Sequence, residues 1–422
     1  MNKFKFNYEE IAKTCVKCGK CKPACTIFGI NKDETSSPRG FIDLINSTQN
    51  GKLDLDKNAK KIFESCFLCT NCVNVCPNNV PTDEMIENIR YDLAQKYGIA
   101  WWKRFFFYLL RRRTFMDFAA KLGYVFQSCG FKVENKEMKP RFSFPMVKKE
   151  RLFPTAKKKS FLNSHPEFID YKGDKTIGIF IGCMGNYAYT DIGEGLLKIC
   201  KALKINAHLM KDQACCAAPA YFTGDFDTVE ANAKKNIAYF EKLLKEENLD
   251  AIIIPEATCS AMIKVDYPKF FHYDKEWQER AIKISEKIYI ASEYFAKHTN
   301  LISYLSKFKN SKTKLTYHDP CHAKKMQGVF DEPREILSQI YELNELSDHD
   351  SCCGFGGVTM QSENYHLSRA VGLKRASQII AIKPQVVSAE CSACKMQLNN
   401  SLHVSNSNLR CENWVELVAK VL

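Results

Sequence analysis

Short apolar runs alternate with longer helical patterns through the second half of the chain. Four of these runs have the length and composition of buried strands, at 176–181, 251–255, 315–317 and 385–389. Between the runs, apolar residues recur at helical spacing, most clearly over 225–245 and 363–382. Strands that alternate with helices predict α/β units with largely parallel sheets. Residues that follow the strands are then expected at the carboxyl edge of each sheet.

The first 160 residues show a different pattern. Short helices are expected over 41–45 and, after Pro81, over 83–95. Two amphipathic helices follow. The apolar side of the first is made by Trp102, Phe105, Phe106 and Leu109, and that of the second by Phe118, Leu122, Val125 and Phe126. Lysine and proline dominate 139–159, which indicates an exposed linker or arm.

Composition is ordinary for a soluble globular protein of two or three domains. The 422 residues are 45% hydrophobic and 26% charged. The N-terminus lacks the apolar core of a signal peptide, and no run approaches the roughly 20 apolar residues that span a bilayer. We therefore expect a cytoplasmic protein that does not cross the membrane.

The net charge of +13 is unevenly distributed. The segment 97–160 holds sixteen Lys and Arg against four Asp and Glu, so it carries twelve of the excess positive charges. Basic residues beside aromatic ones are typical of peripheral contact with an anionic membrane surface, here the inner face of the cell membrane. The alternative, which we favour, is that these helices pack between domains or against an acidic partner. No nucleic-acid partner is expected, because no recognition fold accompanies the basic segment.

Eight of the 20 cysteines form two copies of one spacing, C-x2-C-x2-C-x3-C, with Pro77 after the second copy. In two-cluster bacterial ferredoxins this spacing lets three thiolates hold one [4Fe–4S] cube while the fourth ligates the other cube. The rule assigns one cluster to Cys15, Cys18, Cys21 and Cys76, and the other to Cys66, Cys69, Cys72 and Cys25. Two structural zinc sites are the alternative, but zinc favours pairs of C-x-x-C motifs. Thr26 stands where a proline is expected after Cys25.

The last 250 residues contain an internal repeat of cysteine motifs. Cys183, Cys215-Cys216 and Cys259-x-x-Met262 return as Cys321, Cys352-Cys353-Gly354 and Cys391-x-x-Cys394, at offsets of 138, 137 and 132 residues. The second unit offers five thiols and flexible glycines, which favours an iron–sulfur site over a zinc site or buried free thiols.

The first unit departs from this pattern. Ala217 replaces the glycine, and Met262, whose thioether is a weaker ligand than a thiolate, replaces the last cysteine. A cluster there is the less favoured interpretation, and a packed module with leftover thiols is the more favoured one. Cys200 is expected in a core, and His318 and His322, which flank Cys321, are expected either to tune a redox site or to cap a turn.

The motifs of the second unit resemble the CCG domain of heterodisulfide reductases. With the ferredoxin-type cysteines in front, the chain resembles the iron–sulfur subunits of glycolate oxidase, of lactate utilisation systems and of anaerobic glycerol-3-phosphate dehydrogenase, as well as the cluster-binding heterodisulfide reductase proteins of the same layout. Ser37-Pro38-Arg39-Gly40 is also similar to that family. The resemblance implies a third iron–sulfur cluster, held by Cys321, Cys352, Cys353, Cys391 and Cys394.

The expected architecture is a multidomain α+β and α/β chain. We expect a helical ferredoxin-type domain with two [4Fe–4S] clusters at 1–95 and a basic aromatic helical connector at 96–165. A first, degenerate CCG domain is expected at 166–310 and a second CCG domain at 311–422.

The resemblance implies an electron-transfer subunit. No flavin or nicotinamide motif is present, so an FAD-containing dehydrogenase subunit is expected to oxidise a 2-hydroxy acid such as glycolate or lactate. Electrons are expected to pass towards a quinone or another membrane-associated acceptor. The chain is an expected oxidoreductase component with no catalytic side chain of its own. The alternatives are the glycerol-3-phosphate dehydrogenase subunit and a heterodisulfide reductase-like thiol–disulfide enzyme.

Overall fold

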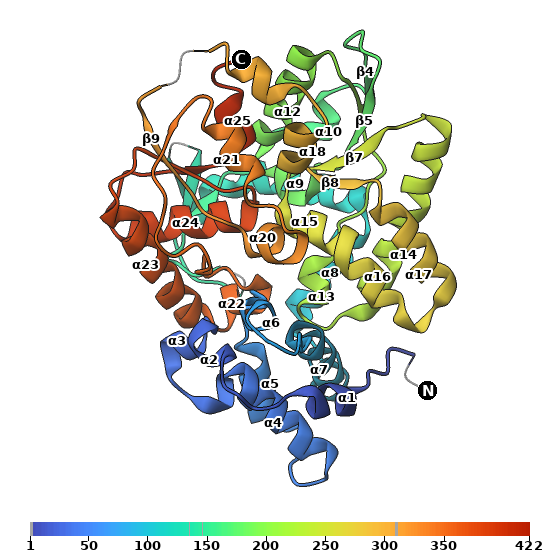
Figure 1. The fold of residues 1–422 in the computed structure, drawn as a ribbon, viewed down its shortest axis with the longest axis vertical. Coiled ribbons are helices and arrows are strands. Elements are labelled where there is room, and N and C mark those ends of the chain that lie inside the picture. The colour runs from blue at the N-terminus through green and yellow to red at the C-terminus, as the bar shows by residue number, and fades with distance from the viewer. Residues whose placement is uncertain (1–2, 135, 146, 309–310) are drawn as a thin grey trace.

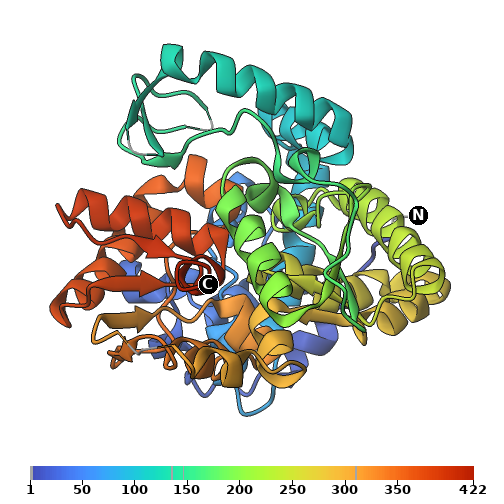
Figure 2. The same cartoon turned by 90° about the horizontal axis from the view of Figure 1, so that it is seen from above.

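The computed structural model describes residues 3–134, 136–145, 147–308 and 311–422. The N-terminal helices form one end of the molecule, and two units that mix helices and strands form the other (Figure 1). Viewed from above, the helices that follow the N-terminal part run along the outer edge of both units (Figure 2). The expected combination of α+β and α/β parts is confirmed.

The N-terminal part contains helices and, among its described residues, no strand. The elements are α1 (Tyr8–Thr14), α2 (Cys21–Ala24), α3 (Phe28–Asn31), η1 (Glu34–Ser36), α4 (Pro38–Gln49), α5 (Lys57–Glu64), α6 (Asn71–Asn74) and α7 (Thr82–Tyr97). Ser37 caps α4 by accepting a hydrogen bond from the Gly40 amide, and Pro38 occupies its first turn. The helices predicted at 41–45 and 83–95 lie within α4 and α7 and are confirmed.

The first mixed unit is built on a five-stranded sheet. Its strands are β4 (Phe168–Ile169), β5 (Thr176–Ile179), β6 (Asn206–Leu209), β7 (Ala251–Ile254) and β8 (Ile288–Ile290), in the order β4-β6-β5-β7-β8. All neighbours are parallel except the edge strand β4. Its helical elements are α10 (Phe161–Ser164), α11 (Gly182–Tyr187), α12 (Thr190–Leu203), α13 (Ala218–Tyr221), α14 (Phe226–Glu246), α15 (Ala257–Ala261), η2 (Met262–Asp266), α16 (Tyr267–Phe270), η3 (Phe271–Tyr273), α17 (Lys275–Ser285), α18 (Ala291–Lys297) and α19 (Leu301–Leu305).

The second mixed unit has a fully parallel sheet. Its strands are β9 (Lys314–Tyr317), β10 (Glu342–Leu343), β11 (Val386–Ser388) and β12 (Cys411–Glu412), in the order β10-β9-β11-β12. Its helices are α20 (Cys321–Gln327), α21 (Glu332–Leu337), α22 (Gly357–Ser362), α23 (Tyr365–Ala381), α24 (Ser392–Val404) and α25 (Trp414–Val418).

The two sheets repeat one topology. If β5, β6, β7 and β8 are counted as the first to fourth strands, their spatial order is second, first, third, fourth, and β9 to β12 follow the same order. The four strands predicted from apolar runs correspond to β5, β7, β9 and β11. The helices predicted at 225–245 and 363–382 correspond to α14 and α23. The internal repeat is therefore confirmed at the level of the fold.

The connector consists of α8 (Trp101–Arg111), α9 (Arg113–Gly130) and the strands β1 (Phe131–Glu134), β2 (Glu137–Pro140) and β3 (Phe153–Pro154), with β1 and β2 forming a hairpin. Both predicted helices exist, and the predicted packing between domains is found only in part, since Trp102, Phe106 and Leu109 of α8 are half-buried. Packing against an acidic partner stays a prediction. In α8 the buried residues are Lys103, Phe107 and Leu110, while Phe105 is exposed. No residue of α9 is buried, although its apolar side was expected to pack. Across the described ranges, no helix has the length and apolar character needed to cross a membrane.

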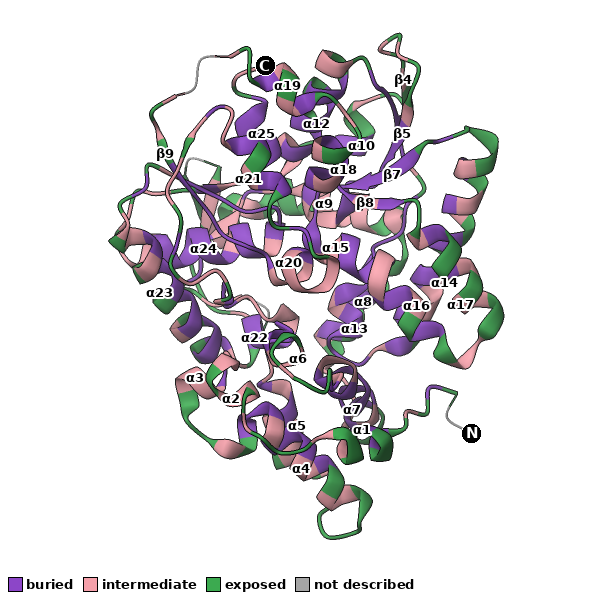
Figure 3. Cartoon of the chain, in the orientation of Figure 1, coloured by how far each residue is buried: buried purple, intermediate pink, exposed green. Residues whose placement is uncertain are grey.

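A buried arginine joins the N-terminal helices to the first unit. Arg90 of α7 is 4% exposed, and its guanidinium donates hydrogen bonds to the carbonyl oxygens of Phe63 (3.0 and 3.2 Å), Cys66 (2.7 Å) and Phe222 (2.9 Å). The first two carbonyls belong to the segment that leads into the second cysteine motif, and the third ends α13. One side chain therefore fixes this segment and docks it on the first unit. Figure 3 shows that α7 is largely buried where it faces the two units.

Arg90→Leu should strongly destabilise the protein, because it leaves three buried carbonyls without their donor. A buried polar group without a partner costs about 1–3 kcal/mol, so a loss on the order of 3 kcal/mol or more is expected. The measurement is the midpoint of thermal unfolding, with limited proteolysis of the N-terminal part as a second readout. Arg104→Leu, at an exposed position of α8, is the matched control and should change stability by less than about 0.5 kcal/mol. Equal midpoints for the two variants would contradict the role of Arg90.

Candidate iron–sulfur site

The structure groups the ferredoxin-type cysteines into two sets. Cys15, Cys18, Cys21 and Cys76 line one small hollow, which Cys72 and Pro77 also border. Cys25, Cys66, Cys69 and Cys72 line a second hollow. The grouping is the crossed one that the spacing predicts, because Cys25 sits with the second motif and Cys76 with the first. The assignment of these eight thiols as cluster ligands stays a prediction.

Backbone amides are aimed at these sulfurs. The Leu68 amide lies 3.4 Å from Sγ of Cys66, and the Arg39 amide hydrogen bonds to Cys21. Burial raises the pKa of Cys25 to about 12, and the amides of Phe28 and Ile27 act in the opposite direction. Such donors stabilise a thiolate, which is the form of cysteine that binds metal.

The Arg39 amide is positioned by the Ser37-Pro38-Arg39-Gly40 sequence. A Cβ atom at Gly40 would lie 1.9 Å from the Glu34 carbonyl oxygen, so only glycine permits α4 to start against η1. The Arg39 side chain donates to Glu34 (2.9 Å) and contacts the Lys17 carbonyl (3.4 Å). This sequence therefore has a local structural role beside the first cysteine set.

The five cysteines of the second mixed unit lie at the carboxyl edge of its sheet, as predicted. Cys321 begins α20 after β9, the Cys352-Cys353 pair follows β10, and Cys391 and Cys394 follow β11. Hydrogen bonds from Cys352 and Cys394 lower the pKa of Cys353 to about 6, and a bond from Cys394 lowers the pKa of Cys391 to about 6. Burial raises the pKa of Cys321 to about 12, so within this set Cys353 and Cys391 are the thiols that most readily become thiolates.

Two histidines lie beside these sulfurs: Nδ1 of His322 is 3.8 Å from Sγ of Cys321, and His318 is next to Cys353 and Cys394. One ring nitrogen of His318 and the Sγ atoms of Cys353 and Cys394 lie within 4.8 Å of one another. Its Nδ1 accepts a hydrogen bond of 3.1 Å from Nε of the buried Arg375. Burial and the Arg375 charge lower the pKa of His318 well below its usual value. The ring is therefore neutral with its proton on Nε2, which makes it a donor beside the two cysteines.

Sequence reasoning singled out His318 but missed Arg375. An arginine in the middle of α23 carries no signal in the sequence, because most helical arginines are exposed. His322, in contrast, contacts the first unit, since its Nδ1 lies 3.3 Å from Oγ1 of Thr258 and its ring stacks on Phe222.

The first unit keeps four thiols together despite its altered motif. The Sγ atoms of Cys216 and Cys259 are 3.3 Å apart, and Cys183 hydrogen bonds to Cys215. Ala217 adopts φ +69°, a left-handed conformation like that of Gly354 (φ +90°), and both amides point back at the first cysteine of their pair. Met262 is fully buried at the position that corresponds to Cys394. Cys200 is buried in α12, as expected.

The two mixed units face each other through the ends of their third strands. Glu256, which follows β7, accepts hydrogen bonds from the amide (2.7 Å) and hydroxyl of Ser392. Glu390, which follows β11, accepts from the amide (2.9 Å) and hydroxyl of Ser292. Burial raises the pKa of Glu256 to about 8 and that of Glu390 to about 7. Thr258 lies 3.5 Å from Sγ of Cys391, so the two cysteine groups are neighbours.

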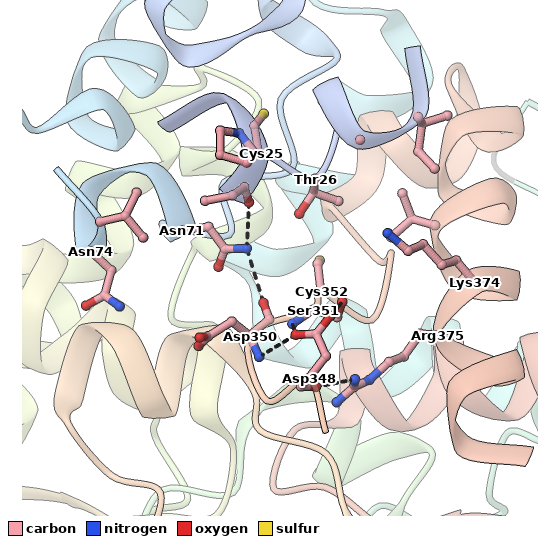
Figure 4. A pocket seen from close by; sticks show the side chains of 16 residues that line it. Cys25, Thr26, Asn71, Asn74, Asp348, Asp350, Ser351, Cys352, Lys374 and Arg375 are labelled. Carbon is pink, nitrogen blue, oxygen red and sulfur yellow. Dashed lines mark hydrogen bonds between the residues drawn. The ribbon is translucent and has the colours of Figure 1, made fainter. Parts of the chain in front are cut away.

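The second ferredoxin-type set meets the second mixed unit directly. The Cys69 thiol hydrogen bonds to Cys352. Between Cys69 and Cys72, the Asn71 amide group donates to the carbonyls of Ala24 (3.0 Å) and Asp350 (3.1 Å) (Figure 4). Lys325 donates to both Asn71 and Asp350. Beside this seam is a cavity of about 290 Å³ that Cys25 and Cys352 both line.

Comparison with known proteins matches three parts of the chain. The family described as "4Fe-4S dicluster domain" matches residues 11–80. The family described as "Cysteine-rich domain" (CCG) matches residues 177–264 and 315–399.

The chain thus carries a 4Fe-4S dicluster domain followed by two CCG domains.

Several proteins are similar to this chain over much of its length. The "Probable glycolate oxidase iron-sulfur subunit" of Bacillus subtilis (strain 168) is 27% identical over 85% of this chain and 82% of that protein. A subunit of the CoM/CoB fumarate reductase of Methanothermobacter marburgensis is 25% identical over 98% of this chain and 73% of that protein. The "Lactate utilization protein A 2" of Bacillus cereus (strain Q1) is 26% identical over 58% of this chain and 98% of that protein.

His318→Leu should lower the reduction potential of a cluster bound at the second CCG domain and leave the iron content unchanged. A hydrogen bond to a charged group contributes about 1.5–3 kcal/mol, which corresponds to about 60 mV or more for a one-electron couple. Redox titration followed by electron paramagnetic resonance measures the shift. His366→Leu, at an exposed position of α23, is the control and should not shift it. Loss of iron in His318→Leu would instead identify the ring as a ligand.

Proposed function

We propose that this chain is an iron–sulfur electron-transfer subunit of the glycolate oxidase and lactate utilisation type. The observation that carries the proposal is the contact between Cys69 and Cys352. It joins the dicluster domain to the second CCG domain, so that three cysteine sets follow one another through the protein. A series of closely spaced redox sites is what an electron-transfer subunit needs.

The donor sets fit iron–sulfur clusters. Two [4Fe–4S] clusters would be held by the two crossed sets of the dicluster domain, and a third cluster by Cys321, Cys352, Cys353, Cys391 and Cys394. When bound, such clusters supply one-electron redox chemistry. The observation that favours them over single zinc ions is the donor set itself, since the second CCG domain brings five thiols to one edge of its sheet, and five exceed the four ligands of a structural zinc site.

The surrounding residues support thiolates and exclude water. Cys352, Cys353, Cys391 and Cys394 are all buried. The Lys325 ammonium acts against the effect of burial on the pKa of Cys69 and of Cys321, and the Arg90 charge does the same at Cys66. Positive charge and amide donors near the sulfurs offset the cost of burying anionic groups.

The proposed partner is an FAD-containing dehydrogenase subunit. The sequence has no dinucleotide-binding motif, so the two-electron oxidation of glycolate or lactate is assigned to that partner and the one-electron steps to this chain. The names of the Bacillus relatives support a 2-hydroxy acid as the substrate of the assembly. The proposed acceptor is a quinone or another membrane-associated carrier.

A heterodisulfide reductase-like activity is the second candidate. It is favoured by the way the two CCG domains turn their cysteines towards each other, with Thr258 between Cys259 and Cys391. The relative from Methanothermobacter marburgensis is named for a CoM/CoB reductase and not for a hydroxy-acid oxidase, which leaves room for this candidate. The buried Met262 argues against it, because a second complete cysteine set would be needed.

Protein purified without oxygen should contain about twelve irons per chain, from three clusters of four. Cys391→Ser and Cys353→Ser should each remove about four irons and one spectroscopic signal. Cys259→Ser is the matched control from the first CCG domain and should retain all twelve, because Met262 has already replaced a thiolate there. Iron analysis with electron paramagnetic resonance measures this. Zinc in place of iron would refute the cluster assignment, and equal losses from both units would assign a cluster to the first.

The proposed electron transfer is tested with a purified FAD-containing dehydrogenase subunit that oxidises glycolate or lactate. The reconstituted pair should reduce the clusters of this subunit within seconds of adding glycolate or lactate, as followed by visible bleaching without oxygen. Glycerol 3-phosphate serves as the alternative substrate, and a disulfide added to the dithionite-reduced subunit tests the second candidate. Reoxidation by the disulfide and no reduction by either hydroxy acid would overturn the proposal in favour of that candidate.

A further inference from the structure

Helix α9 has an apolar face that nothing in the described chain covers. Phe115, Phe118, Leu122, Val125 and Phe126 recur at helical spacing and are all exposed, Phe118 at 61% and Val125 at 66%. A helix of a globular protein normally turns such a stripe towards the core. Figure 2 shows that α9 runs along the outer edge of the molecule.

The uncovered face belongs to a larger surface, which we call the aromatic arm and define as residues 101–142 without Asn135. Of the seventeen exposed large apolar residues described, eleven lie in this segment. Besides α9, they include Trp101 (75% exposed), Phe105 and Tyr108 of α8, and Val133 and Phe142 around the hairpin. Exposed apolar residues that gather in this way indicate an interaction surface, whereas scattered ones do not.

The arm is also basic. Within the described part of the chain, six of its exposed cations have no ion pair: Arg104, Arg111, Arg112, Lys121, Lys139 and Arg141. The guanidinium of Arg112 lies 4.9 Å from the ring centre of Tyr108 and 5.9 Å from that of Phe115. Asp117, the one acidic residue of α9, is turned inward and accepts a hydrogen bond of 2.8 Å from Tyr187.

We propose that the aromatic arm docks on an anionic lipid surface. A helix of 18 residues is about 27 Å long and can lie flat at the headgroup boundary with its apolar side inserted. Tryptophan, tyrosine and phenylalanine settle at that boundary, and long basic side chains reach the headgroup phosphates. A lipid surface requires no specific complementary side chains, so an apolar stripe flanked by unpaired cations is sufficient to bind it. The inference is independent of the electron-transfer proposal.

The test uses the full cluster-loaded protein and sucrose-loaded vesicles of phosphatidylcholine, with and without phosphatidylglycerol. Sedimentation should recover the protein with the anionic vesicles at low salt, and high salt should release it. Trp101 should be quenched by brominated lipid in these vesicles, and Trp101→Phe should reduce that quenching.

Two arm variants separate the apolar and the charge contributions. Phe118→Gln/Val125→Gln/Phe126→Gln and Arg111→Glu/Arg112→Glu should each weaken partitioning at least about tenfold, since each basic residue near such a surface contributes about fivefold. The controls are Phe168→Gln/Ile282→Gln and Lys52→Glu/Lys57→Glu, which remove exposed apolar or basic groups elsewhere. They should bind like the unaltered protein, and all four variants should keep the iron content.

Absence of binding to anionic vesicles at low salt overturns the proposal, as does an equal loss in the controls. Self-association in the absence of lipid that the Phe118→Gln/Val125→Gln/Phe126→Gln variant abolishes would show that a second copy covers the arm. Retention of the arm variants on anionic vesicles together with loss of binding to the flavoprotein would assign the surface to that partner.

Discussion

The arrangement of the domains depends on placing backbone amides and positively charged side chains next to cysteine sulfurs that are buried in the protein. The second ferredoxin-type set and the cysteines of the second CCG domain lie where segments from different domains meet. Arg90 shows how this is achieved, since one guanidinium binds the carbonyls of Cys66 and of Phe222 at the end of α13. Lys325 and Asn71 do the same at the second CCG domain. The seams between domains are therefore polar at their centres, and the donor groups of Arg90, Asn71 and Lys325 have partners there.

The repeated sheets show how one topology keeps its geometry when its ligands change. The first CCG domain has lost a glycine and a cysteine, yet Ala217 holds the left-handed turn that Gly354 adopts without strain. A non-glycine residue in this region costs on the order of 1 kcal/mol, so the surrounding packing must fix the turn. The two domains also stabilise each other through Glu256 and Glu390, which are held by serines across the junction.

Strands, repeat and cysteine grouping followed from the sequence because each has a local signal. Apolar runs predicted β5, β7, β9 and β11, but β10 and β12 have two residues each, too few to show a pattern. Arg90 and Arg375 were missed because their partners lie far away in the chain. The sequence also did not show that Phe118 and its neighbours are exposed in this chain. An apolar stripe indicates that a helix has a partner, but it does not indicate which partner.

The hydrogen bond between Asn71 and Asp350 spans 279 positions of the chain. At about 5–20 residues per second, a ribosome that has added Asn71 needs roughly 15–55 s to reach Asp350. Throughout that interval Cys69 and Cys72 have no second CCG domain above them. Biogenesis therefore includes a window in which the dicluster domain is open to the machinery that delivers iron and sulfide, and synthesis of the C-terminal domain closes it.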